Sequence, residues 1–185
     1  MMELNELMNR KWPQQEIKAY FDSLEPISTH MIYGLWRGEE VNTPHPMTSL
    51  LKKANWYGKY FEDDNNVTPI VMQDKSGELF AANPGLLSLK APLKLVKLLP
   101  KSFFDVGVTL IKPLFKTKSS KARLRMMDYN GTPTAAMIYD QKPLIDYLKK
   151  IDDNTLLGMV DETTISKHQT HYFILIRDDS NWRPF

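Results

Sequence analysis

Four side chains that could hold an anionic ligand share one face of a predicted strand, by the two-residue period of β-structure: Arg123, Arg125, Met127 and Tyr129. If this face points into the core, the guanidinium groups require an anionic partner, because an unpaired buried charge is costly. That partner is either internal, Asp140 or Asp146, or a ligand phosphate or carboxylate, which guanidinium binds through paired hydrogen bonds. If the face points outward, both arginines are solvated.

His168 and His171 invite a metal interpretation, but residues three apart in a strand point to opposite faces and chelate poorly. The 185 residues include no cysteine, which excludes thiolate metal sites, iron–sulfur clusters, disulfides and a cysteine nucleophile. The sequence also lacks the Gly-x-Ser-x-Gly, phosphate-loop and His-Glu-x-x-His motifs. We therefore expect a non-enzymatic protein without catalytic residues, metal or cofactor.

Basic charge is concentrated in one segment. Residues 90–125 hold ten basic residues and one acid, a net charge of +9, which leaves −7 for the rest of a chain of net charge +2. Such a block beside apolar residues predicts an anionic partner: a lipid headgroup, a fatty-acid carboxylate or a nucleic acid. Lysine outnumbers arginine there and the interleaved residues are aliphatic, so we expect no nucleic-acid binding.

The surrounding elements predict how these residues are positioned. Pro13 opens a predicted amphipathic helix to about Leu24. Residues 30–82 alternate in the manner of a strand meander, with a short helix at 48–54. Residues 86–116 are rich in leucine and lysine and predict a helical lid or insertion across a barrel mouth.

The C-terminal part returns to strand texture. Strands are predicted at 121–129, 134–139, 155–161 and 171–177, whereas 143–147 is expected to be a short turn or helix. Because strands and helices do not alternate regularly, a parallel sheet is excluded. The fold we expect is mainly β: one domain over 1–185, an antiparallel barrel of about 8–10 strands with an N-terminal helix and the insertion.

The segment Gly34-Leu35-Trp36-Arg37-Gly38-Glu39 resembles the opening strand of the family named after its GXWXG motif, a lipocalin-like (calycin) barrel. Further matches follow in order: Ala122-Arg123-Leu124-Arg125, then Gly131, Ala135-Ala136-Met137, Tyr139-Asp140, Gln141–Asp146 and Leu157–Asp161. These are similar to the family's companion C-terminal domain of unknown function. The resemblance covers about residues 30–178 and implies a closed or nearly closed barrel that holds a hydrophobic ligand, a phospholipid or fatty acid.

The same resemblance implies a role for the two ends of the barrel sheet. In lipocalin-like barrels a basic residue of the last strand lies over the opening tryptophan, which predicts a cation–π contact between Arg177 and Trp36. The alternative is that Trp36 contacts the ligand directly.

Methionine is frequent, with ten in the chain, and suits either an acyl-chain pocket or irregular core packing. The ligand-binding residues we predict are these: Trp36, Arg123, Arg125, Met127, Tyr129, Met137 and Tyr139. A lipid-binding protein of this charge is also expected to contact anionic membrane surfaces transiently.

A heme-binding barrel is the alternative function. The nitrobindins, which are lipocalin-like heme proteins, open with a similar motif and carry a histidine near the last strand, a placement that His171 resembles. Residues 1–10 lack the apolar core of a secretory signal, and no stretch reaches the ~20 apolar residues of a membrane span. We therefore expect a cytoplasmic protein.

Overall fold

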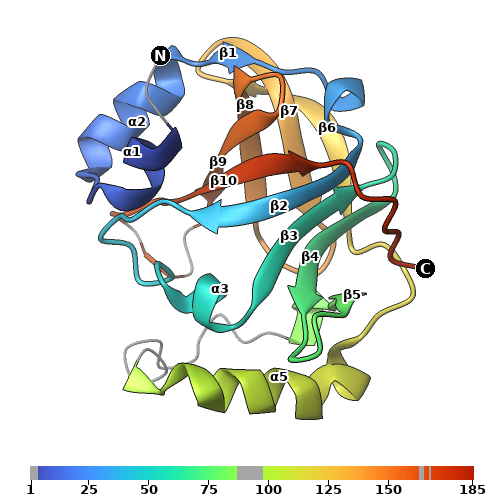
Figure 1. Ribbon diagram of the computed structural model, residues 1–185. Helices are drawn as coiled ribbons and strands as arrows, with labels where there is room; N and C mark the ends of the chain where they lie inside the picture. Colours follow the sequence, from blue (N-terminus) through green and yellow to red (C-terminus); the bar gives the residue numbers. More distant parts are fainter. Residues whose placement is uncertain (1–3, 87–97, 163–164, 167) are drawn as a thin grey trace.

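A closed antiparallel β-barrel organises the chain in the computed structural model, which describes residues 4–86, 98–162, 165–166 and 168–185 (Figure 1). Within these residues eight strands close the barrel by antiparallel pairing. They are β2 (Gly34–Glu40), β3 (Trp56–Phe61), β4 (Val67–Gln73), β6 (Ala122–Tyr129), β7 (Thr132–Tyr139), β8 (Ile145–Asp152), β9 (Thr155–Asp161) and β10 (His171–Asp178). The predicted fold class is confirmed.

Two short strands extend this sheet: β1 (Glu25–Pro26) pairs with the end of β8, and β5 (Leu79–Ala81) pairs with β4. Closure joins the last strand to the first, with Arg177 opposite Trp36 and Ile174 opposite Glu39. Every barrel strand has a neighbour on each side, and the contact between β4 and β6 is a single residue pair, Val67 opposite Ala122.

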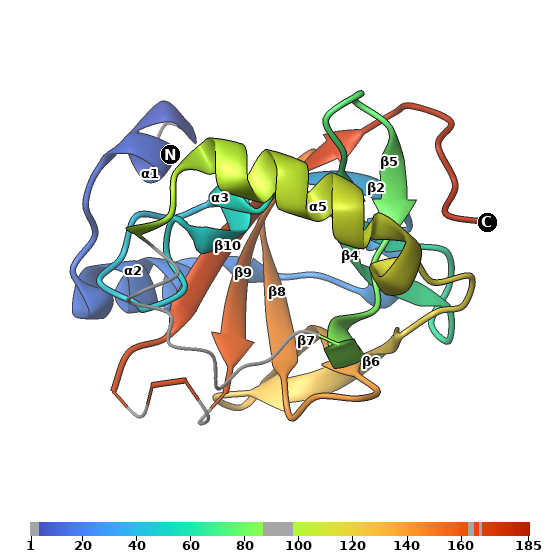
Figure 2. The ribbon, with the colours of Figure 1, turned by 90° about the horizontal axis from the view of Figure 1, so that it is seen from below.

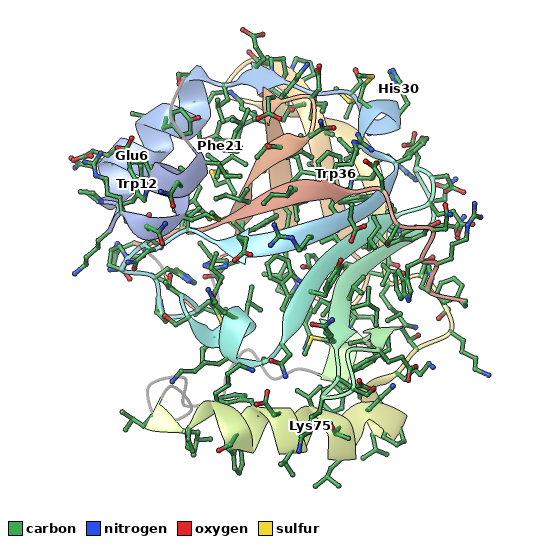
Figure 3. The ribbon with its side chains drawn as sticks, in the orientation of Figure 1. Glu6, Trp12, Phe21, His30, Trp36 and Lys75 are labelled. Atoms are coloured by element: carbon green, nitrogen blue, oxygen red, sulfur yellow. The ribbon has the colours of Figure 1, made fainter. Side chains whose placement is uncertain are left out.

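Two helices precede the barrel and cover part of its outer wall. The helix α2 (Gln14–Ser23) confirms the predicted amphipathic helix, whereas α1 (Leu4–Asn9) lies in a segment whose polar sequence gave no helix signal. Trp12 and Phe21 are fully buried between these helices and the strands, and Figure 3 shows both on that side of the barrel. An apolar layer outside the barrel therefore adds to the one inside it.

The barrel interior is closely packed toward one end, and we call this part the packed half. Alternate residues of the strands point inward and bury a layer in which no side chain is more than 2 % exposed. Its members include Trp36, Phe61, Leu124, Met137, Leu148, Leu156 and Leu175. Trp36 donates its indole N–H to the carbonyl of Ile32 at 2.7 Å and lies toward the end away from α5 (Figure 3).

The strand β8 corrects one prediction. We expected a short turn or helix at 143–147, but residues 145–152 form a strand. Both faces of β8 are buried: Leu148 points into the barrel, and Tyr147 packs beneath the N-terminal helices. Charged Asp146 and Lys149 are buried too, so the usual polar–apolar alternation is missing from its sequence.

The helix α5 (Lys101–Phe115) crosses the other end of the barrel (Figure 2). Val108 packs on Phe80 and Ala82 beside β5, and Phe104 faces the barrel interior. Together with the short α3 (Leu50–Lys53), α5 covers this end, as expected of a lid. The predicted insertion of 86–116 is confirmed for α5, while residues 87–97 lie outside the described residues.

None of the described helices is both long and apolar enough to cross a bilayer.

Candidate functional site

A cavity of about 350 Å³ occupies the half of the barrel beneath α5. Its apolar walls come from every side of the barrel and from the covering helices: Leu50, Trp56, Ile70, Phe104, Val160 and Phe173. The far end of the Phe173 ring lies against Gly158, where a Cβ would be 2.2 Å from the ring. Gly158 therefore makes room for an aromatic wall.

The inner end of the cavity is polar. Lys59 of β3, Tyr139 of β7 and Asp146 of β8 converge there, and we call these three residues the polar floor. The Lys59 ammonium lies 2.8 Å from Asp146 Oδ2, and the side chains of this ion pair are 3 % and 1 % exposed. The Tyr139 hydroxyl accepts a hydrogen bond from Lys59 at 3.2 Å and donates to Asp146 Oδ2 at 3.4 Å.

Lys59 is also surrounded by aromatic rings. Its ammonium lies 4.8 Å from the centroid of Phe173, 5.5 Å from that of Tyr139 and 5.7 Å from that of Trp56. It donates a further hydrogen bond to the carbonyl of Pro69 at 3.2 Å. Cation–π attraction and these bonds together offset the desolvation of the buried charge.

Burial shifts the acidity of the floor. Desolvation raises the pKa of Asp146, and the adjacent Lys59 ammonium opposes that rise. Burial and the nearby Asp146 charge raise the pKa of Tyr139 well above its usual value. The phenol therefore stays protonated and keeps its O–H as a donor to the carboxylate.

Two histidines, His45 and His171, also line the cavity. His45 Nε2 is 3.4 Å from Glu162 Oε1, and its Nδ1 accepts a hydrogen bond from the backbone N–H of Met47 at 3.1 Å. This acceptor role places the proton of a neutral His45 on Nε2, facing the carboxylate. The ring of His171 is 5.3 Å from that of His45. No group of three or more potential metal ligands is found among the described residues.

The lid helix is attached by ion pairs at its C-terminal end and by hydrogen bonds at its N-terminal end. Lys112 lies 2.7 Å from Asp74 and 2.8 Å from Glu78, in the turn before β5. At the other end Lys101 contacts Asp105 at 2.7 Å, and both hydrogen-bond to Asn55 at 2.8 Å. These contacts fix α5 over the cavity.

Trp36 and Arg177 form the predicted cation–π contact. The guanidinium carbon of Arg177 is 4.3 Å from the Trp36 ring centroid, and the group donates to the carbonyls of Tyr33 and Met31 at 3.1 and 2.8 Å. Trp36 belongs to the packed half and does not line the cavity.

Arg123 and Arg125 lie on the outer face of the barrel. Arg123 is 3.5 Å from Asp140, an exposed ion pair. Arg125 donates to the carbonyl of Asp64 at 2.8 Å and to the side chain of Asn65 at 3.0 Å. The outward alternative for this face is therefore the correct one.

The remaining predicted ligand residues divide between two places. Met127 and Tyr129 pack outside the barrel against the N-terminal helices, where the Tyr129 hydroxyl donates to Asp22 at 3.0 Å. Met137 is fully buried in the packed half. Of the seven predicted residues, all of them described, Tyr139 lines the cavity and the other six do not.

Lys59 is the site residue that sequence reasoning missed. The segment 56–61 is rich in aromatic residues, and its one lysine was not singled out as a candidate site residue. Irregular pairing between β3 and β4 turns Trp56, Lys59 and Phe61 all inward, against simple alternation. The signal that marks Lys59 is a single charge inside an aromatic strand, together with Asp146 in another apolar segment.

Comparison with known families gives two matches. The sequence model described as "GXWXG protein" matches residues 19–77, and "Domain of unknown function (DUF4334)" matches residues 120–177. Together they span the strands on both sides of the α5 insertion. A search of curated proteins gave no match.

Among solved structures, the chain is similar to a crystal structure of a protein from Thermomonospora curvata. The TM-score is 0.66 at 24% identity, and the alignment covers 91% of this chain and 89% of that chain. At this identity the likeness shows a common barrel fold and carries no statement about ligand.

Proposed function

The chain belongs to the GXWXG protein family, with its C-terminal domain of unknown function, and we propose that it binds a small, largely apolar molecule inside the barrel. The observation that carries the proposal is the cavity itself: apolar walls, a buried polar floor and a helix across the mouth. Sites for small molecules combine such walls with a few placed polar groups.

The size of the cavity narrows the ligand class. A volume of about 350 Å³ lies near the lower end of the range of about 300–1,000 Å³ for small-molecule sites. This favours a single aliphatic chain, such as a medium-chain fatty acid or alcohol, over a phospholipid with two acyl chains. A carboxylate of such a ligand belongs at the mouth, where Lys142 lines the cavity.

The test is displacement of a fluorescent apolar probe by decanoate and decanol, with organic extraction of the purified protein to identify any co-purifying lipid. Ala54 lines the cavity beside α3, so Ala54→Phe should fill part of it and weaken binding at least tenfold. Lys52→Phe places the same ring on an exposed position of α3 and should leave binding unchanged. Failure of every apolar probe to bind the folded protein contradicts the proposal.

The outer face of α5 supports a second proposal, transient contact with an anionic membrane surface. Phe103, Val106, Leu110 and Leu114 form an exposed apolar stripe at helical spacing, with Leu110 and Leu114 73% and 74% exposed. The stripe lies within the segment of net charge +9 and directly over the cavity. An exposed apolar helix face within a basic segment suits an interface with anionic lipid.

Co-sedimentation with phosphatidylglycerol and phosphatidylcholine vesicles tests this contact. Binding to the anionic vesicles is expected, with loss in the variant Phe103→Ser/Leu110→Ser and retention in Met126→Ser, which removes an exposed apolar side chain of β6. A stripe that instead mediates self-association would give a dimer in light scattering and no vesicle binding, and would overturn the membrane proposal.

A further inference from the structure

We propose that the polar floor receives a hydrogen-bond donor from the bound ligand, a hydroxyl group, through Asp146 Oδ1. The inference rests on the proposed function and adds the chemistry of the ligand's inner end. It follows from an account of which donors and acceptors of the floor are already used.

The donors of the floor are committed. An ammonium has three N–H groups, and Lys59 directs them to Asp146 Oδ2, the Tyr139 hydroxyl and the Pro69 carbonyl. The Tyr139 O–H is directed to Asp146 Oδ2. Of the floor's own groups, none has a donor left for a ligand.

One acceptor of the floor is not committed. Asp146 Oδ1 is buried, and it has no hydrogen-bond partner among the described residues. Asp146 itself is 1% exposed and lines the cavity. A buried carboxylate oxygen without a donor is destabilising, and an ionised carboxylate accepts at both oxygens.

This pattern selects between ligand end groups. A carboxylate at the floor would meet Asp146 without a donor to hold it, and like charges at short distance repel. A hydrocarbon end would leave Oδ1 without a partner in an apolar cavity. A hydroxyl group of the ligand can donate to Oδ1 and carries no charge, so it supplies the hydrogen bond that Asp146 lacks.

The experiment compares ligands that differ only at the inner end. Decanol is matched with decane, and ω-hydroxydecanoate with decanoate, in competition with a fluorescent apolar probe. Because a hydrogen bond to a charged group is among the stronger ones, each hydroxylated ligand should bind about tenfold tighter or more than its partner.

A paired variant assigns the preference to the floor. Lys59→Met/Asp146→Leu replaces the buried ion pair by apolar side chains of similar volume, a change that folded proteins often tolerate. It should lose the hydroxyl preference, measured as the affinity ratio of the matched ligands, whatever the absolute affinity of the variant for the probe. Asp140→Asn, which removes an exposed carboxylate on the outer face, should keep the preference.

The outcomes separate this inference from the proposed function. If the probe binds and the matched ligands have equal affinity, then water rather than the ligand donates the hydrogen bond to Asp146 Oδ1. This result overturns the inference alone. A hydroxyl preference that persists in Lys59→Met/Asp146→Leu also overturns it. If no apolar probe binds the folded protein, the proposed function fails and the inference with it.

Discussion

Lys59 and Asp146 show how one ion pair defines the site. Each charge is tolerated because of the other, since both side chains are almost completely buried. Removing one partner leaves an uncompensated charge, whereas removing both does not. The floor therefore acts as a unit, with Tyr139 bonded to both members.

The single variant Lys59→Met should lose about 3–5 kcal/mol of stability near neutral pH, because Asp146 is then buried without its cation. Burial already raises the pKa of Asp146, and loss of Lys59 raises it further. A raised carboxyl pKa means that the folded state binds the proton more tightly, so the deficit should shrink as the pH falls through that pKa. Urea unfolding across pH 4–8 measures it. A deficit independent of pH would contradict the assignment.

Arg177 packs on Trp36 in the packed half of the barrel. A substitution of Arg177 can separate a structural role of Trp36 from direct contact with a ligand. Arg177→Ala removes the cation–π contact and two hydrogen bonds to carbonyls, which should cost about 1–3 kcal/mol in thermal or chemical unfolding. Affinity for apolar ligands should not change, because Trp36 lies outside the cavity. If Arg177→Ala instead weakened ligand affinity at unchanged stability, the alternative that Trp36 contacts the ligand directly would be the correct one.

At the scale of elements, the alternation of apolar and polar residues predicted most of the barrel strands, because most of them have one buried face and one more exposed face. The strands β2, β3, β4 and β5 all fall within the strand meander predicted for residues 30–82. β8 was missed because helices cover its outer face, so both sides of the strand are buried. α1 was missed because Leu7 is its one buried residue and six residues give little periodicity.

The candidate site was harder to predict for a related reason. A two-residue period says which residues share a face, but it does not say which face is inside. Arg123 and Arg125 were therefore correctly grouped, and the structure placed the group outward. Lys59 escaped because irregular pairing of β3 breaks the period at that residue.

The element whose attachment bears most directly on ligand entry is α5. Lys112 holds it to Asp74, and this hydrogen bond lowers the pKa of Asp74 well below its usual value. A carboxyl group whose pKa is lower in the folded state stabilises the fold at every pH above its unfolded-state pKa. This stabilisation is lost only as the pH falls through the folded-state pKa. Lys112→Met should loosen α5 already at neutral pH. Hydrogen exchange of α5 amides should rise several-fold while β7 and β9 stay protected. Uniform exchange would mean that the ion pairs do not hold the lid.

At the scale of the whole molecule, the barrel divides stability and binding between its two halves. The packed half, with Trp36, Phe61 and Leu148, supplies close packing that a cavity cannot. The N-terminal helices add a second apolar layer outside it. The hollow half can therefore hold buried charge and empty volume without loss of the fold.

This division also bears on the heme alternative. His171 lines the cavity and its ring lies 5.3 Å from that of His45, so a histidine is present where a heme ligand would be needed. A porphyrin is a broad, rigid plate, however, and a cavity of about 350 Å³ between the packed half and α5 does not accommodate it without displacing the lid. Hemin added to the protein should therefore leave no Soret band after gel filtration, and His171→Ala should change nothing. A Soret band that is retained by the native chain and lost in His171→Ala would show that the lid opens for heme, and the barrel would then be a heme protein rather than a carrier of small apolar molecules.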